Sequence, residues 1–183
     1  MPDALATALL QEIRQRFHGL KEQAERAIAQ VPPEAFFGTL DEESNSIGLI
    51  MKHVGGNLRS RWRDFLSSDG EKPDRHRDLE FQRTADDSVE STLALWNEGW
   101  GCLANTLESL GPDDLLHTVH IRGEAHTVVQ AVERSLVHTA GHAGQIVLLA
   151  KHAAGPGWRT LSISRGASDA FTREMHERQR GRQ

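Results

Sequence analysis

Apolar residues recur at helical spacing in four long stretches of the chain. They fall three or four positions apart, so each stretch would present one apolar stripe on a helix. The spacing predicts helices over about residues 3–30, 46–66, 87–110 and 127–152. Proline or glycine follows three of these stretches, beginning at Pro32, Gly111 and Gly155, as is typical of helix ends. The pattern predicts an all-α protein, a four-helix bundle with connections of unequal length.

Two of the connections differ from ordinary loops. Residues 67–81 are rich in charged and turn-forming residues and have no clear period. A connection of this length in a compact protein is often functional or a crossover. Residues 116–126 are short and β-prone, with a turn at 122–124, and lead into the last long helix. A further short helix is expected from Ser168.

The last long helix carries His138 and His142, which lie four residues apart. Residues at this spacing project from one face of a helix, the geometry in which a helix offers two nitrogen ligands to one metal ion. Both lie on the stripe that should face the core. The nearby Gly141 and Gly144 each cost about 1 kcal/mol relative to alanine, which predicts close approach by a neighbouring helix or a ligand. From spacing alone, the alternative is a pair of core histidines that serve packing.

Length and composition limit the classes of protein to which the chain can belong. With 183 residues the chain is expected to form one domain, residues 1–183, with a core at about 3–153 and a C-terminal extension at 154–183. The net charge of -5, with both signs interspersed, gives no basic surface for nucleic acid. The single cysteine, Cys102, excludes an intrachain disulfide and is expected to be a buried structural thiol. No signal peptide or membrane-spanning stretch is seen, so we expect a soluble cytoplasmic protein without nucleic-acid or membrane partners.

Several short segments occur in an order that resembles a known superfamily. They are His53 early in the second predicted helix, the run from His138 to Ile146 in the fourth, and residues 62–65, 122–127 and 158–163. In this order and spacing they resemble the DinB/YfiT-like superfamily of proposed metalloenzymes, and in particular a branch of unknown function. The resemblance covers nearly the whole chain.

The resemblance implies an up-down-down-up topology for the bundle and a divalent metal held by His53, His138 and His142. Zinc and nickel are the usual ions in the superfamily, and homodimers are common. Many members have an aromatic residue before the second ligand, whereas this chain has Ala140 and Gly141 there and no tyrosine at all. A catalytic tyrosine is therefore excluded. By periodicity alone, His53 lies off the apolar stripe of its helix and would be a boundary histidine.

Three histidines leave at least one coordination position open, as in catalytic metal sites. The metal would lower the pKa of a bound water or ionise a substrate thiol. By analogy with superfamily members, we expect a thiol transferase or hydrolase acting on a small molecule, with a low-molecular-weight thiol as a candidate cofactor. One alternative is a metal- or ligand-binding bundle without turnover, in a stress-related or accessory role. Another is a structural dimer whose histidines bind no metal.

Candidate partners for the ligand histidines are Glu98, Asn57 and Gln145. Glu98 is the residue we nominate as general base, and a solvated helix carboxylate is the alternative. A second group, His117, His120 and His126, offers a competing metal site. Residues three apart in a strand point to opposite faces, which favours a surface hairpin with exposed histidines instead. His126 is also a candidate for the approach to the metal site.

Overall fold

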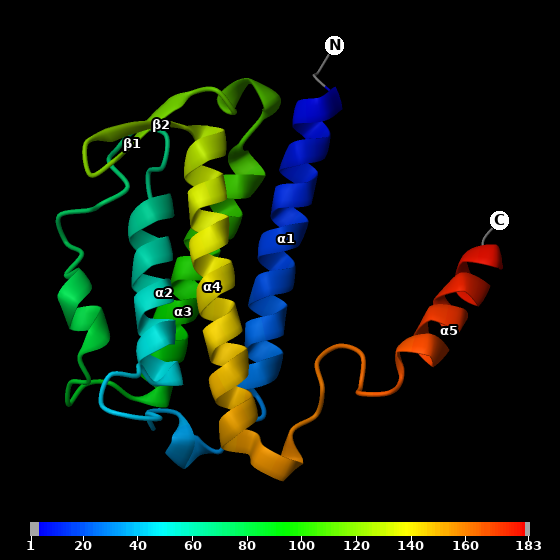
Figure 1. Ribbon diagram of the computed structural model, residues 1–183. Coiled ribbons are helices and arrows are strands. Elements are labelled where there is room, and N and C mark those ends of the chain that lie inside the picture. The colour runs from blue at the N-terminus through cyan, green and yellow to red at the C-terminus, as the bar shows by residue number, and fades with distance from the viewer. Residues whose placement is uncertain (1–3, 182–183) are drawn as a thin grey trace.

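The computed structural model describes residues 4–181, and within these residues the protein is mostly helical with one small two-stranded sheet (Figure 1). The helices are α1 (Ala4–Ile28), α2 (Ile47–Trp62), α3 (Val89–Ser109), α4 (Val128–Ala154) and α5 (Ser168–Arg180). The strands are β1 (Thr118–Ile121) and β2 (Glu124–Thr127). The helices predicted from apolar spacing are therefore confirmed, and so is the β-prone segment before α4.

One predicted boundary is wrong by several residues. The apolar spacing extended the second helix to residue 66, but α2 ends at Trp62. Arg63 is already extended, and Asp64 has a φ of 50°, a left-handed conformation that short polar side chains tolerate better than most. Phe65 still reaches the core from outside the helix and stacks on Trp62, with ring centroids 4.6 Å apart. Its apolar side chain therefore extended the pattern beyond the helix itself.

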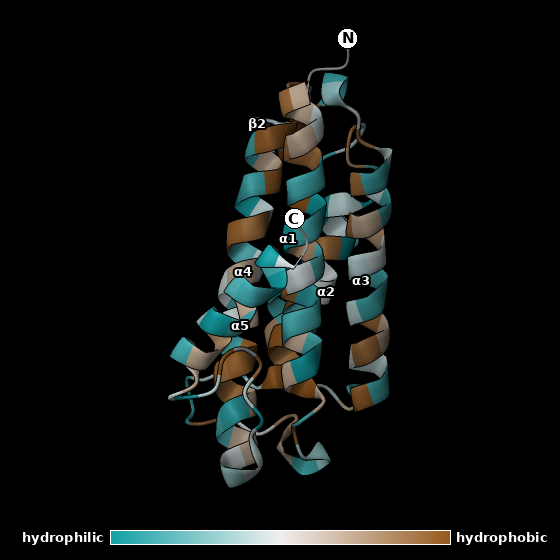
Figure 2. Ribbon diagram, turned by 90° about the vertical axis from the view of Figure 1, so that its right-hand side faces the viewer, coloured by the Kyte–Doolittle hydropathy of each residue, from teal (hydrophilic) through white to brown (hydrophobic). Residues whose placement is uncertain are grey.

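The four long helices lie side by side, as both views show (Figure 1, Figure 2). The most extensive contacts are those of α2 with α3 and of α1 with α4. The crossing of α2 and α3 is close because both helices have glycine there: a Cβ on Gly99 would lie 2.4 Å from the carbonyl oxygen of Gly55. Only a residue without a side chain allows this distance between the backbones.

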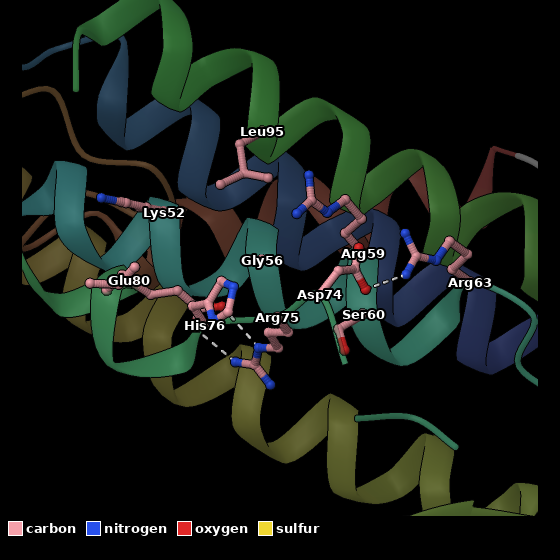
Figure 3. A pocket seen from close by; sticks show the side chains of 11 residues that line it. Lys52, Gly56, Arg59, Ser60, Arg63, Asp74, Arg75, His76, Glu80 and Leu95 are labelled. Atoms are coloured by element: carbon pink, nitrogen blue, oxygen red, sulfur yellow. Dashed lines mark hydrogen bonds and ion pairs between the residues drawn. The ribbon is translucent and has the colours of Figure 1, made fainter. Parts of the chain in front are cut away.

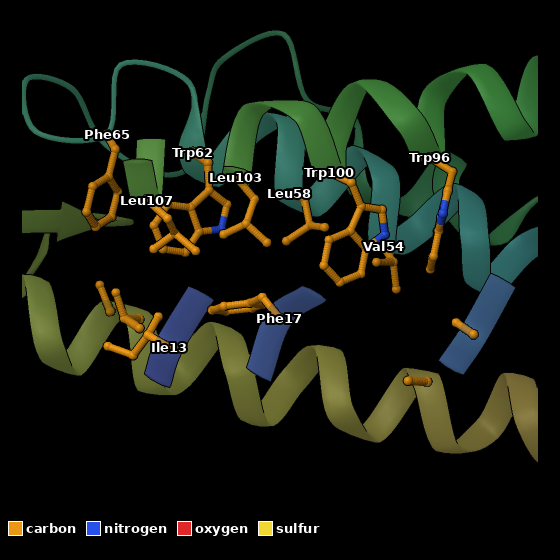
Figure 4. Close-up of a cluster of buried hydrophobic side chains, with 14 of the residues drawn as sticks. Ile13, Phe17, Val54, Leu58, Trp62, Phe65, Trp96, Trp100, Leu103 and Leu107 are labelled. Carbon is orange, nitrogen blue, oxygen red and sulfur yellow. The ribbon is translucent and has the colours of Figure 1, made fainter. Parts of the chain in front are cut away.

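The apolar core lies between these helices (Figure 4). Phe17 of α1 meets Trp62 of α2 and Trp100 of α3 edge to face, with ring centroids 6.2 and 6.4 Å apart. The indole nitrogen of Trp62 also donates a hydrogen bond to Ser135 Oγ of α4 at 3.3 Å. These buried aromatic rings therefore link all four long helices to one another.

Local hydrogen bonds fix where α2 and α4 begin. Ser46 Oγ accepts from the backbone N–H of Leu49 at 3.2 Å, and this cap confirms the predicted start of α2. Thr127 and Gln130 form a reciprocal capping box at the start of α4. Because Thr127 is also the last residue of β2, the hairpin delivers the chain directly into α4.

The connection between α2 and α3 folds back along α2 and includes a short 3₁₀ helix, Arg77–Phe81. Asp69 ties the connection to the β1–β2 turn, because its carboxylate accepts from the backbone N–H groups of Arg122 and Gly123 at 2.8 and 2.7 Å. The long charged segment therefore lies against α2 and covers one face of that helix.

The C-terminal helix α5 stands away from the four long helices (Figure 1), and none of its residues is buried. Among residues 4–181, no helix has both the length and the apolar character needed to cross a membrane.

Candidate metal centre

Three histidines from two helices meet at one point of the structure: His53 of α2, and His138 and His142 of α4. Each offers a ring nitrogen, and these nitrogens lie within 4.8 Å of one another. The Nε2 atoms of His53 and His138 are 3.1 Å apart. Two nitrogens bound to one tetrahedral zinc ion would be separated by about 3.3 Å. The structure thus brings together all three predicted ligands, in a cluster that is compatible with metal binding.

The position of His138 and His142 follows from the helix geometry that the sequence predicted. They lie one turn apart on α4, with ring centroids separated by 4.6 Å, and their stripe continues into the buried residues Ser135 and Ile146. The close approach of a neighbouring helix expected at the nearby glycines is wrong, while approach of a ligand stays a prediction. A Cβ on Gly141 or Gly144 would meet nothing within 4 Å, because both positions are exposed and no other helix of residues 4–181 approaches them.

His53 is almost fully buried, with 3% of its surface exposed, and is not a boundary residue. The 3₁₀ helix of the α2–α3 connection covers it, and the ring centroids of Phe81 and His53 are 4.5 Å apart. The periodicity of α2 described only the face that packs on other long helices. It carried no information about a covering segment that comes nearly thirty residues later, so the boundary interpretation failed.

Hydrogen bonds orient two of the three imidazoles. His53 donates from Nδ1 to Glu80 Oε2 at 2.8 Å, and His142 donates from Nδ1 to Gln145 Oε1 at 2.8 Å. Each ring is thereby left with Nε2 as the acceptor nitrogen. Histidines that bind metals in proteins commonly use their second nitrogen in this way, towards a carboxylate or carbonyl oxygen. Gln145 therefore contacts its predicted partner, while the Nδ1 of His138 is buried without a hydrogen-bond partner in the described part of the chain.

The surroundings keep two of the histidines uncharged. Burial, and then the proximity of His142 and His53, lowers the pKa of His138 to about 3. Burial also lowers the pKa of His142. Both imidazoles are consequently neutral near pH 7, which is the form that binds metal ions.

Glu80, which partners His53, is itself buried and doubly held. Arg75 donates to its two carboxylate oxygens from Nε and Nη2, both at 2.8 Å, in the paired geometry typical of strong arginine–carboxylate contacts (Figure 3). Burial acts to raise the pKa of the Glu80 carboxyl, but the hydrogen bonds from Arg75 and His53 outweigh it and the pKa is lowered. Glu80 therefore accepts the histidine N–H as a carboxylate.

Gly56 of α2 makes room for this carboxylate. A Cβ at Gly56 would lie 2.4 Å from Glu80 Oε1. Neither Glu80 nor Arg75 is predicted from the sequence. The one signal available was the length and charge of residues 67–81, which indicated a functional connection without identifying the residues. A groove of about 180 Å³ lies where this connection meets α2 and α3, and none of the three histidines lines it (Figure 3).

The nominated general base, Glu98, lies outside the histidine cluster. Its carboxylate pairs with Arg59 at 3.3 Å, and 54% of its side chain is exposed, as expected of a solvated helix carboxylate. A catalytic role for Glu98 stays a prediction. Cys102 is half-buried, and burial and the negative charge of Glu98 raise the pKa of its thiol. The thiol therefore stays protonated at neutral pH.

The second group of histidines lies on the hairpin and does not converge. His117 and His120 are exposed, as predicted for a surface hairpin. His126 is half-buried and accepts a hydrogen bond from Arg134 at 3.3 Å. Within residues 4–181, the cluster of potential ligand atoms that is tight enough for one ion is that of His53, His138 and His142.

One family model matches the chain, over residues 4–167, and describes a protein of unknown function (DUF1572). No curated protein and no solved structure matches it.

Proposed function

The chain belongs to the DUF1572 family of proteins of unknown function. We propose that it is a metal-dependent enzyme of the DinB/YfiT-like type. His53, His138 and His142 would hold one divalent ion, with zinc or nickel as the candidates. The observation that carries the proposal is the convergence of three imidazoles, two of which donate from Nδ1 and therefore have an unprotonated Nε2.

The directions of the long helices support the proposed superfamily. In Figure 1, α1 and α4 run one way and α2 and α3 run the opposite way. This order corresponds to the up-down-down-up topology that the sequence resemblance implies. The ligand positions agree with the resemblance as well, since one histidine comes from α2 and two come from α4.

Three protein ligands leave room for a substrate or a water in the site. When bound, the ion would act as a Lewis acid and lower the pKa of a thiol or a water. The chain's own residues provide the rest. Glu80 keeps the acceptor nitrogen of His53 directed at the cluster, and Phe81 covers this histidine from solvent. The proposed reaction is therefore transfer of a thiol to, or hydrolysis of, a small molecule.

A metal-binding protein without turnover is the second candidate. It is favoured by the lack of a free carboxylate beside the three histidines in the described part of the chain. Glu80 is occupied by Arg75 and His53, and Glu98 is paired with Arg59 elsewhere. An enzyme of this type would then need a base that comes from the substrate or from solvent.

The metal content of protein purified without an affinity tag tests the proposal. We expect about one divalent ion per chain in the wild type and none in His53→Ala or in the double variant His138→Ala/His142→Ala. His126→Ala is the matched control, because His126 lies on the hairpin outside the cluster. A wild type that takes up no metal after incubation with zinc or nickel would contradict the proposal.

Turnover separates the two candidates. The metal-loaded protein is screened with low-molecular-weight thiols and electrophiles, and with small esters. Activity that disappears in His138→Ala would support the enzyme. Bound metal without any turnover would support the binding protein.

A further inference from the structure

A cavity of about 240 Å³ adjoins the histidine cluster and is lined by side chains of mostly one charge. His53 and His138 are part of its lining. The lining also includes five arginines and no aspartate or glutamate: Arg61, Arg75, Arg77, Arg122 and Arg134. Cavities lined by one sign of charge concentrate ligands of the opposite sign.

Four of these arginines already have a carboxylate partner. Arg75 pairs with Glu80, and the others pair with acidic residues that lie outside the cavity lining. Arg61 differs from them. It is 9% exposed, its Nη1 is buried without a hydrogen-bond partner, and within residues 4–181 it forms no ion pair. Burial lowers its pKa to about 10, which still leaves the guanidinium charged at neutral pH.

A buried charge without a direct partner is costly, because the group has lost hydration and the charge of Glu71 acts on it only from beyond ion-pair distance. The chain nevertheless holds Arg61 in place. Gly70 leaves the space that the side chain occupies, since a Cβ there would lie 2.9 Å from Arg61 Cδ. The arginine is thus ordered in advance, without an ion-pair partner among the described residues, at the wall of a cavity.

Arg61 and His53 lie on the same face of α2. They are eight residues apart, with Asn57 midway, and all three line the cavity. Eight residues correspond to about 12 Å along a helix. A small molecule in the cavity can therefore have one end at the histidines and the other at Arg61.

We infer that the cavity binds a small-molecule substrate through an oxyanion, a carboxylate or a phosphate, that pairs with Arg61. Its reactive end faces His53 and His138. Guanidinium groups match the oxygens of both anions in the same paired geometry. Asn57 and Ser135 add neutral hydrogen-bonding groups to the same lining. The inference rests on the proposed function for the role of the histidines, and on Arg61 for the class of substrate.

The test is titration calorimetry of the metal-loaded protein with inorganic phosphate and, separately, with succinate. We expect binding of at least one of them, and the tighter one identifies the anion. Arg61→Met should weaken it by about 10- to 100-fold, the loss of a charge-assisted contact, with the metal content unchanged. Arg59→Met is the matched control. Arg59 lies on the same helix but pairs with Glu98 and does not line this cavity, so the affinity should change by less than about twofold.

Equal anion affinity in the wild type and in metal-retaining Arg61→Met would overturn the inference, and so would a wild type that binds neither anion. The metal assay above is independent of this result. If the wild type binds no metal, the proposed function fails, and the same titrations on the metal-free protein still decide the role of Arg61.

Thermal unfolding without metal or anion gives a second readout, in case the variant folds poorly. An arginine held for a ligand predicts that Arg61→Met melts at the same or a higher temperature than the wild type, since an unpaired buried charge is removed. Clear destabilisation of Arg61→Met would instead show that Arg61 serves packing, and would overturn the inference.

Discussion

The two faces of α2 are both buried, yet they are built from opposite kinds of side chain. One carries Val54, Leu58 and Trp62, and the other carries His53, Asn57 and Arg61. Each set repeats every four residues, and the two sets are offset by one position, which is about 100° around a helix. The apolar face packs against the other long helices, and the polar face lies under the α2–α3 connection and beside the cavity.

The difference lies in what each face requires from its neighbours. Apolar burial has no direction, so any well-packed side chains can cover Leu58 or Trp62. Buried polar groups need a partner at a defined angle and distance. His53 has one in Glu80, whereas the buried Nη1 of Arg61 has none among residues 4–181. We therefore expect changes on the apolar face to alter stability, and changes on the polar face to alter binding.

Trp62→Ala should produce the largest loss of stability. It removes a ring that is 1% exposed and touches Phe17 and Phe65, so the free energy of unfolding should fall by about 3–5 kcal/mol. Urea denaturation measures this loss. The folded fraction should keep the metal content of the wild type, and the half-exposed Trp158→Ala is a milder control. Loss of metal from folded Trp62→Ala would mean that the two faces are not independent.

Glu80→Gln should weaken metal binding as well as stability. The amide keeps the size of the side chain but loses the charge that receives His53 and Arg75. We expect metal affinity to fall by about 10- to 100-fold and the free energy of unfolding by about 2–3 kcal/mol, measured by competition with a chelator and by urea denaturation.

Glu71→Gln is the matched control for Glu80→Gln. Glu71 also pairs with Arg75 but has no contact with His53, so metal affinity should stay close to that of the wild type. If both variants lost metal equally, the effect would come from Arg75 and not from orientation of His53.

Stability of the metal-free protein should decrease as the pH falls from 7 to 5. The folded-state pKa of His138 is about 3, below its unfolded value of 6.5, and the pKa of His142 is shifted in the same direction. Below pH 6.5 the unfolded chain therefore binds protons that the folded chain does not, which favours unfolding. Denaturation at several pH values measures the slope, and His138→Gln/His142→Gln should flatten it. An unchanged slope in that variant would assign the pH dependence to other groups.

The smallest effect is expected for Glu98→Gln, which touches neither face of α2. Glu98 forms an exposed pair with Arg59, and such pairs contribute about 0–1 kcal/mol. The free energy of unfolding and the metal content should both stay near the wild-type values. If a substrate is found, a large fall in kcat with unchanged metal content would support the original nomination of Glu98 as general base.

The sequence predicts well what depends on neighbours along the chain. The long helices, their capping at Ser46, and the shared face of His138 and His142 all follow from residues within a few turns. The end of α2 was placed too late because Phe65 continues the apolar pattern while Asp64 leaves the helix.

Contacts between distant segments could not be predicted in this way. Only the family resemblance predicts His53 as a metal ligand. The segment that buries it, Arg77–Phe81, comes more than twenty residues later in the chain. Arg61 carried no local signal, and the signal for Glu80 was only the length and charge of residues 67–81. Their importance arises from burial and pairing, which depend on how the connection folds back on α2.

The space left by Gly56 couples docking of the α2–α3 connection to ligand binding at the histidines. Glu80 can reach His53 only while its segment rests against α2 at this glycine. A ligand that prefers the oriented histidine binds more tightly when the segment is docked. By linkage, the bound ligand then stabilises the docked segment by the same free energy. Amide hydrogens around residues 77–81 would then exchange more slowly in the metal-bound protein. Affinity at the centre would be tuned, without any change to its ligands, by how often a surface segment opens.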